Sequence, residues 1–158
     1  MDSLPGTIPG ASDFVGALRR YVGALEYRPK KSCIVVETAS GPRGFCDCAG
    51  LPLIGLRDIG LLPGDFDPNF PDAQHRETEI LRVLRRLGRR ASSKPPFKLG
   101  DVLVTGTPGL FHVMTVCSAS DNTVRIIEAP TAHGIVCERP LDTHDYHSIR
   151  SAFRLFNG

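Results

Sequence analysis

The spacing of hydrophobic residues changes near the middle of the chain. Up to about residue 98, apolar residues recur every three or four positions, which is typical of amphipathic helices. From Asp101 onward, apolar and polar residues alternate in short runs between turn residues, which is typical of strands. Helices followed by strands predict an α+β domain in which the N-terminal helices pack on a central antiparallel sheet.

Three helices are predicted in the first half. Apolar residues keep helical spacing from Asp13 to Glu26. The segment from Cys48 to Gly60 is apolar enough for a buried helix, and Pro52 fits its first turn, where a missing N–H costs little. Residues Asp72 to Leu87 have the pattern of an amphipathic helix with basic residues on its polar side.

Short β-branched or alternating runs predict a sheet of about five to six strands. Ile34 to Thr38 suits an edge strand or an inserted loop, because Lys, Ser, Gly and Pro flank it. The other candidates follow Asp101: Val102–Thr105, Phe111–Cys117, Thr123–Glu128, Gly134–Glu138 and Ile149–Phe153. Pro- and Gly-rich stretches at 63–71 and 92–97 are predicted to be connectors.

Length and composition indicate one globular domain. We expect it to cover residues 1–158, with an extended N-terminal segment at 1–12 and a helical insertion at 63–98. A content of 41% hydrophobic and 23% charged residues excludes a disordered chain, a fibre and a membrane bundle. The longest stretch without Asp, Glu, Lys or Arg, at 102–120, is too often interrupted for a membrane span. The first residues lack the basic and apolar runs of a signal peptide.

Positive charge is concentrated in one segment, although the net charge of the chain is only +2. Seven basic residues and no acidic residue lie between Arg82 and Lys98. This pattern favours the solvated face of the helix at 72–87. The alternative is a surface that docks on an acidic polymer or protein. Nucleic acid is a less favoured partner, because three Tyr and no Trp leave few rings for base stacking.

Cys48 stands where the central helix is predicted to begin. Unpaired backbone N–H groups and the helix dipole stabilise a thiolate at such a position. Ala49 and Gly50 follow it and leave room for a substrate to approach. A buried, inert cysteine is the alternative interpretation. Because the five cysteines are odd in number and include no CxxC pair, we expect reduced thiols and no zinc knuckle.

His112 and Glu128 form the second candidate constellation. A hairpin that pairs Cys117 with Thr123 would place His112 directly opposite Glu128, on an otherwise apolar face that helices could cover. The carboxylate could then orient the imidazole and stabilise its charged form, while the other ring nitrogen serves a thiol. The alternative is a surface pair that stabilises only the hairpin, and a one-residue shift in register would separate the two faces.

A further cluster of polar residues precedes the last strand. It contains two histidines and two aspartates: Asp142, His144, Asp145 and His147. Such residues could coordinate a metal. Because they lie in a polar turn, we expect no metal there and no cofactor elsewhere.

Four motifs follow one another in a distinctive order. They are Tyr27 after the first helix, Asp47-Cys48-Ala49-Gly50-Leu51 at the central helix, His112-Val113 in a strand and Ile126-Ile127-Glu128-Ala129 in the next strand. In this order, residues 13–156 resemble the NlpC-type cell-wall peptidases, which are papain-like cysteine hydrolases. Residues 148–154 are similar to the last strand of the versions carried in phage tails. The resemblance implies a papain-like NlpC-type fold.

The resemblance also implies an activity. The protein would be a cysteine peptidase or amidase that hydrolyses peptidoglycan stem peptides, at the bond between D-γ-glutamate and a diamino acid. Cys48 would be the nucleophile, His112 the general base and Glu128 the group that orients His112. Tyr27 and Asp47 would line the substrate and oxyanion side, and no metal or cofactor would be needed. Its partners would be peptidoglycan peptides and other proteins of a phage tail tip, within a virion that acts at the host cell wall.

Several positions depart from the pattern of this family. Glu128 stands where the third residue is usually neutral, and its charge should favour an imidazolium. Met114 replaces a glycine, Cys46 adds a second thiol near the nucleophile, and Tyr27 lies further upstream of Cys48 than in the family. A catalytically weak or inactive structural tail protein, or an assembly adaptor on the same fold, is therefore the alternative function.

Overall fold

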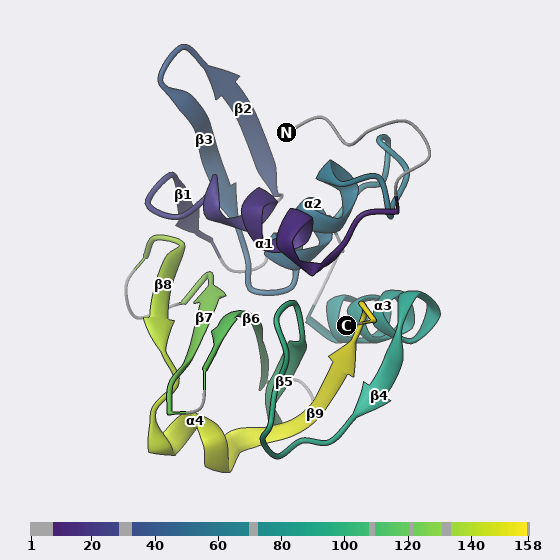
Figure 1. The fold of residues 1–158 in the computed structure, drawn as a ribbon. Helices are drawn as coiled ribbons and strands as arrows, with labels where there is room; N and C mark the ends of the chain where they lie inside the picture. Colours follow the sequence, from purple (N-terminus) through teal and green to yellow (C-terminus); the bar gives the residue numbers. More distant parts are fainter. Residues whose placement is uncertain are drawn as a thin grey trace.

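Two β-sheets and four helices make up the part of the chain that the computed structural model describes, residues 8–28, 33–69, 73–107, 110–120, 122–130 and 134–157 (Figure 1). The helices are α1 (Ala11–Arg19), α2 (Gly50–Asp58), α3 (Ala73–Leu87) and α4 (Thr143–Ser148). The strands are β1 (Leu25–Tyr27), β2 (Ile34–Thr38), β3 (Gly41–Cys46), β4 (Arg89–Ala91), β5 (Val102–Thr107), β6 (Leu110–Ala119), β7 (Val124–Glu128), β8 (Cys137–Pro140) and β9 (Ile149–Arg154). None of the helices in these residues is long and apolar enough to cross a membrane. The predicted α+β class is confirmed.

The larger sheet has six antiparallel strands in the order β4-β9-β5-β6-β7-β8, as the prediction of about five to six strands required. The smaller sheet has the order β1-β3-β2, with β2 at its free edge. Strands β2 and β3 form a hairpin that projects away from the larger sheet (Figure 1). An isolated bridge between Glu26 and Ile135 joins the two sheets near the site described below.

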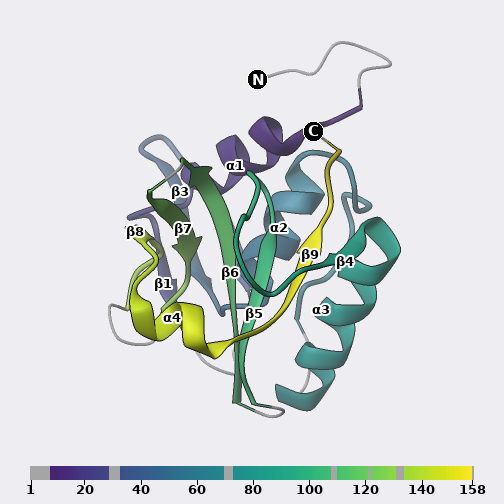
Figure 2. The same ribbon diagram turned by 60° about the horizontal axis from the view of Figure 1, so that its bottom comes forward.

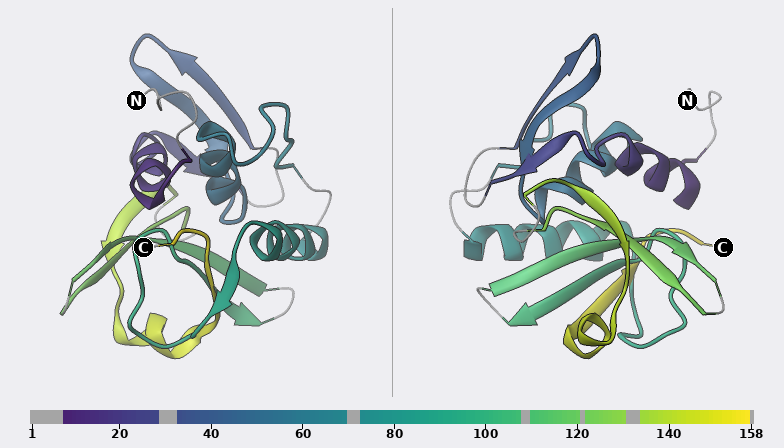
Figure 3. Two further views of the ribbon diagram at one scale, coloured as in Figure 1. Left: turned by 45° about the vertical axis from the view of Figure 1, so that its right-hand side comes forward. Right: turned by 90° about the vertical axis from the view of Figure 1, so that its left-hand side faces the viewer.

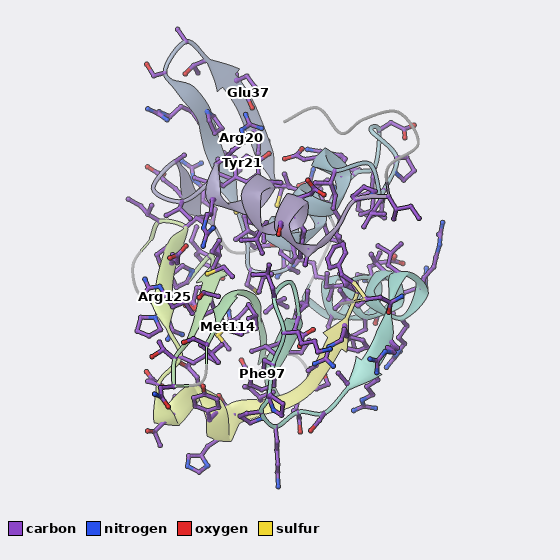
Figure 4. All side chains as sticks on the ribbon, in the orientation of Figure 1. Arg20, Tyr21, Glu37, Phe97, Met114 and Arg125 are labelled. Atoms are coloured by element: carbon purple, nitrogen blue, oxygen red, sulfur yellow. The ribbon has the colours of Figure 1, made fainter. Side chains whose placement is uncertain are left out.

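Helices α1 and α2 lie between the hairpin and one face of the larger sheet (Figure 3). Their buried side chains, such as Phe14 and Leu53, share one core with Val104, Val113 and Ile127 of the sheet. The end of α1 is also tied to the hairpin, because Arg20 donates a hydrogen bond of 2.6 Å to Glu37 (Figure 4). This core fixes the start of α2 against the larger sheet.

The opposite face of the larger sheet packs on α4 and on the connector at 92–97 (Figure 2). The ring of Phe97 stacks on Tyr146 of α4, with the centroids 6.3 Å apart, and covers a second core that includes Met114 and Ile126. Met114 and Ile126 lie on the strand face expected to carry His112 and Glu128, so α4 and the connector cover this face and the N-terminal helices do not. Both faces of these strands are apolar, so alternation alone could not show which face receives α1 and α2.

The predicted helix at 13–26 is wrong in its second half. Helix α1 ends at Arg19, and residues 25–27 form β1 instead. Gly23 has a φ of +76°, which breaks the helix, and its N–H donates to Val136 O at 2.8 Å. Leu25 is nevertheless buried in the core that α1 joins, which explains why it continued the helical pattern of apolar residues.

The predicted insertion at 63–98 contains the expected amphipathic helix, α3. Ile80 and Leu84 on its apolar side are fully buried. The structure adds a short strand, β4, which pairs with β9 and was not predicted because it is only three residues long and carries two arginines. Residue 72, the predicted first residue of the helix, lies outside the described residues.

Candidate active site

Cys48 lies in the turn between β3 and α2, with its side chain partly exposed. The helix begins two residues later, at Gly50, whereas the predicted helix begins at Cys48. Asp47 closes the turn, because its Oδ1 accepts a hydrogen bond from the N–H of Gly50 at 2.7 Å. The thiol Sγ lies 4.0 Å from the carbonyl oxygen of Phe111 on β6, so the turn brings Cys48 to the end of the larger sheet.

The register of β6 and β7 differs from the prediction. Val116 pairs with Ile126, and a bulge follows before the next pair along β6, so the predicted pairing of Cys117 with Thr123 is wrong. The loop between these strands was assumed to close without a bulge. A bulge inserts one extra residue into a strand, and the sequence pattern of this hairpin does not predict one.

This register places His112 and Glu128 diagonally across the two strands. If the pairing of Thr115 with Ile127 is continued along β6, His112 lies opposite residue 130, two positions beyond Glu128. Because the shift is an even number of residues, both side chains keep the same face. His112 Nε2 lies 3.5 Å from Glu128 Oε2, so the predicted proximity holds although the directly opposite pairing does not.

His112 interacts with both Cys48 and Glu128, and its Nε2 forms an ion pair with Glu128. Burial by itself lowers the pKa of His112, but the hydrogen bonds and charges of Cys48 and Glu128 outweigh burial and raise its pKa to about 9. Since Nε2 faces Glu128, the other ring nitrogen is left for the thiol. The imidazolium form of His112 is thus favoured at neutral pH.

Glu128 is held by a row of charges that runs away from the thiol. Its side chain is only 4% exposed, and its Oε2 accepts a hydrogen bond of 3.0 Å from Arg139 on β8. Arg139 also donates two hydrogen bonds, of 2.6 and 3.0 Å, to Asp145 on α4. Burial raises the pKa of Glu128, but the hydrogen bonds with His112 and Arg139 outweigh burial and lower it. Glu128 is therefore a charged carboxylate.

Asp47 and Tyr27 also lie beside the nucleophile. Asp47 Oδ2 lies 3.3 Å from Nε of Arg76 in the first turns of α3, and both side chains are buried. Tyr27 on β1 pairs with Cys46 of β3. Burial, followed by the charges of Cys48 and Asp47, raises the pKa of the Tyr27 phenol. The structure thus brings together all five residues that the sequence singled out.

Two arginines were missed by the sequence analysis. Arg139 lies diagonally across β7 and β8 from Glu128, so the register arithmetic used for His112 would also have found it. Arg76 comes from a separate helix, and nothing in the sequence links it to Asp47. Both arginines contact site residues rather than forming part of a recognisable motif.

The residues near α4 have structural roles. Asp142 and Asp145 cap the helix reciprocally, with Asp142 Oδ1 accepting from the N–H of Asp145 at 2.8 Å. Asp145 also binds Arg139, as described above. Within the described ranges, no group of three or more His, Cys, Asp and Glu side chains is arranged to hold a metal.

Gly50, in the motif that follows Cys48, is required for close packing. A Cβ atom at this position would lie 2.1 Å from Cys33 Sγ and 3.0 Å from Asp47 Oδ1. We expect Gly50→Ala to destabilise the protein by about 1–3 kcal/mol, because the neighbouring side chains must shift. Urea unfolding would measure the change in the free energy of unfolding.

The matched variant is Gly16→Ala in α1, where a Cβ would meet no atom within 4 Å. This variant is expected to gain about 0.5–1 kcal/mol of stability from helix propensity. Adding Cys33→Ala to Gly50→Ala should restore most of the lost stability. An unchanged stability of Gly50→Ala would show that Cys33 does not restrict this position.

Comparisons with known proteins identify the fold. No family model and no curated protein matches the chain. Among solved structures, the chain is similar to the peptidoglycan hydrolase RipB from Mycobacterium tuberculosis, with a TM-score of 0.59 and 21% identity over 99% of this chain and 75% of that one. An NlpC/P60 family protein from Bacillus cereus gives a TM-score of 0.58 and 19% identity over 96% of this chain and 42% of that one. The protein Ly7917, whose structure is also known with the hydrolysing product of MDP, gives a TM-score of 0.57 and 11% identity over 93% of this chain and 63% of that one.

These similarities define a class of fold. The α+β arrangement of helices on a six-stranded antiparallel sheet is that of NlpC/P60 papain-like proteins. The NlpC-type fold expected from the sequence is confirmed. The chain spans less than half of the Bacillus cereus protein.

Proposed function

We propose that the protein is a cysteine peptidase or amidase that hydrolyses amide bonds in peptidoglycan stem peptides. The observation that carries the proposal is the row Cys48, His112 and Glu128, in which a thiol near a helix start interacts with an imidazole that is paired with a carboxylate. The fold, shared with a peptidoglycan hydrolase and with NlpC/P60 proteins, supports the choice of substrate.

In this proposal, the Cys48 thiolate attacks the carbonyl carbon of the scissile amide. The backbone N–H of Cys48 donates to the oxyanion that forms. The imidazolium of His112 gives its proton to the departing amine, which leaves a thioester on Cys48. Water then attacks the thioester while His112 accepts its proton, and the acid product and the thiol are released. Glu128 holds the ring of His112 in place during both steps.

The remaining site residues have supporting roles. Asp47 is occupied by Gly50 and Arg76, so it holds the turn that presents Cys48. The Tyr27 hydroxyl lines the substrate side of the site, within the electrostatic reach of Cys48. The proposed bond lies between D-γ-glutamate and a diamino acid, and the proposed setting is a phage tail tip that assists cell-wall penetration. The similarity of residues 148–154 to the last strand of the phage versions supports that setting.

Digestion of purified peptidoglycan tests this function. The wild-type protein should release muropeptides in which glutamate has a new free carboxyl group and the diamino acid a new amine, both detectable by mass spectrometry. The control is protein whose exposed thiols were first alkylated with iodoacetamide. If walls of several chemotypes release no fragments, the peptidase proposal fails, and a structural tail protein becomes the better interpretation.

A further inference from the structure

A strip of exposed arginines runs along the solvent side of α3 and continues into β4. It consists of five residues, which we call the arginine strip: Arg82, Arg85, Arg86, Arg89 and Arg90. Arg82 pairs with Glu79 at 2.6 Å. The other four make no ion pair with any residue in the described part of the chain. Four exposed positive charges without an acidic partner in the described residues therefore follow one another over Arg85–Arg90.

This arrangement opposes folding rather than assisting it. Residues three or four apart on a helix are neighbours, and like charges at these spacings repel. Arg82, Arg85 and Arg86 have this spacing on α3, and Arg89 and Arg90 follow directly in β4. The potential of such a surface attracts anions over distances of about one Debye length, roughly 8–10 Å. A bound polyanion would remove the repulsion.

The surroundings of the arginine strip favour a charged polymer over a folded protein. Protein interfaces usually contain an apolar core with aromatic anchors. The exposed large hydrophobic residues of the described ranges all lie elsewhere: Ile8, Val22, Ile34, Val36 and Ile135. Phe97, the nearest aromatic residue along the chain, is 5% exposed and packs on Tyr146, so it offers no ring for base stacking.

A hollow beside the arginine strip is lined by arginines from three elements and by one carboxylate, that of Glu77. Its volume is about 270 Å³, and its lining includes Arg85 from α3, Arg90 from β4 and Arg150 from β9. Arg150 is paired with Glu77, whereas Arg85 and Arg90 have no acidic partner within the described ranges. The planar guanidinium group binds phosphate oxygens through two parallel hydrogen bonds. Arg85 and Arg90 could bind one phosphate in this way, beside Arg150 and its partner Glu77.

The arginine strip also lies close to the proposed catalytic thiol. Arg76 contacts Asp47, the residue before Cys48, and Arg85 follows nine residues later on the same helix. At 1.5 Å per residue, Arg85 lies about 14 Å along α3 from Arg76. A polymer bound to the strip would hold the site next to the material in which that polymer is embedded.

We propose that the arginine strip binds a linear polyol-phosphate polymer of the bacterial cell wall, with a phosphate seated in the hollow between Arg85, Arg90 and Arg150. The choice of a wall polymer rests on the proposed function. The rest of the inference rests on three observations. These are the positive charges of the strip, the lack of exposed large apolar residues on it, and the hollow beside it. Binding would concentrate the enzyme on the wall without taking part in hydrolysis.

Titration of the wild-type protein with fluorescently labelled poly(glycerol phosphate) tests this surface. Neutralising four phosphates releases about four counterions, so the logarithm of the binding constant should fall with the logarithm of the salt concentration with a slope of about −3. Between 50 and 200 mM salt, the affinity should then fall roughly 60-fold. A quadruple Gln variant should lose most binding at 50 mM salt, and its binding constant should depend less steeply on the salt concentration. It combines Arg85→Gln, Arg86→Gln, Arg89→Gln and Arg90→Gln.

The controls separate this surface from general charge and from catalysis. The combined variant Arg20→Gln and Arg43→Gln removes two exposed arginines near the hairpin and should bind the polymer almost as wild type. Four Arg→Lys replacements in the strip should retain part of the binding, because charge remains while the paired hydrogen bonds are lost. The quadruple Gln variant should still cleave a soluble stem peptide at the wild-type rate.

Three outcomes would overturn the inference. In the first, the wild type does not bind poly(glycerol phosphate) at 50 mM salt. In the second, the quadruple Gln variant binds it as tightly as the wild type does. In the third, duplex DNA binds to the wild type as tightly as poly(glycerol phosphate) does at the same phosphate concentration. The last outcome would make nucleic acid the partner. Because none of these measurements needs hydrolysis, polymer binding without peptide cleavage would contradict the proposed function and leave the arginine strip intact.

Discussion

Replacing Cys48 with alanine is expected to abolish the release of muropeptides, with a loss of about 10⁴-fold or more in rate. Alanine cannot form the thioester, and no other group near His112 replaces the thiol as nucleophile in the proposed mechanism. Because Cys48 is partly exposed and lies in a turn, the substitution removes no core packing and should leave the fold unchanged. Mass spectrometry of the digested wall would measure the effect.

Cys46 provides the matched control for this substitution. It lies two residues upstream, is fully buried, and burial raises the pKa of its thiol above the ordinary value. Cys46→Ala should therefore keep most of the activity, and circular dichroism would show that both variants are folded. If Cys46→Ala lost activity while Cys48→Ala kept it, the assignment of the nucleophile would be wrong.

Replacing Glu128 with glutamine is expected to move the alkaline limb of the pH profile to lower pH. The hydrogen bonds with Cys48 and Glu128 raise the pKa of His112 to about 9, so the imidazolium is present below this pH and is lost above it. Without the negative charge, the pKa of His112 should fall by about one unit or more. Plotted against pH, kcat/KM for a soluble stem peptide should decline earlier, with a reduction of about threefold near pH 8.5 that approaches tenfold well above pH 9.

Arg139→Gln gives the complementary test, because it should affect the acidic limb instead. Arg139 helps to lower the pKa of Glu128, so its loss raises that pKa and Glu128 takes up a proton at a higher pH. The acidic limb of kcat/KM should move upward, while the alkaline limb stays near its wild-type position. A general loss of stability would change neither limb. Unchanged profiles in both variants would show that Glu128 only stabilises the hairpin.

The elements of the fold could be predicted where local pattern decides them. Helix α3 and the strands of the larger sheet follow directly from their periodicity, because one side of each is buried. The strand β1 could not be distinguished from a continued helix, since Leu25 is buried in the same core either way. Which face of the sheet receives α1 and α2 depends on contacts between distant residues, and alternation on two apolar faces says nothing about it.

The site was predictable in part for a similar reason. Side chains alternate between the two faces of a strand, so a shift in register by two residues leaves His112 and Glu128 on the same face. Their proximity was therefore predictable, although the bulge in β6 changed their pairing. The position of Cys48 followed from the apolar helix after it. Arg76 reaches Asp47 from α3, which belongs to the predicted insertion, and no local pattern records a contact of this range.

The row His112, Glu128, Arg139 and Asp145 alternates in sign, and this alternation sets an order in which the site can evolve. If Glu128 is neutralised first, Arg139 keeps its two hydrogen bonds to Asp145 and is not left without a partner. If Arg139 is lost first, the buried Glu128 and Asp145 both lose their cation, which is far more costly. A charged residue at position 128 therefore depends on an arginine at position 139, whereas that arginine can outlast the loss of the charge at position 128.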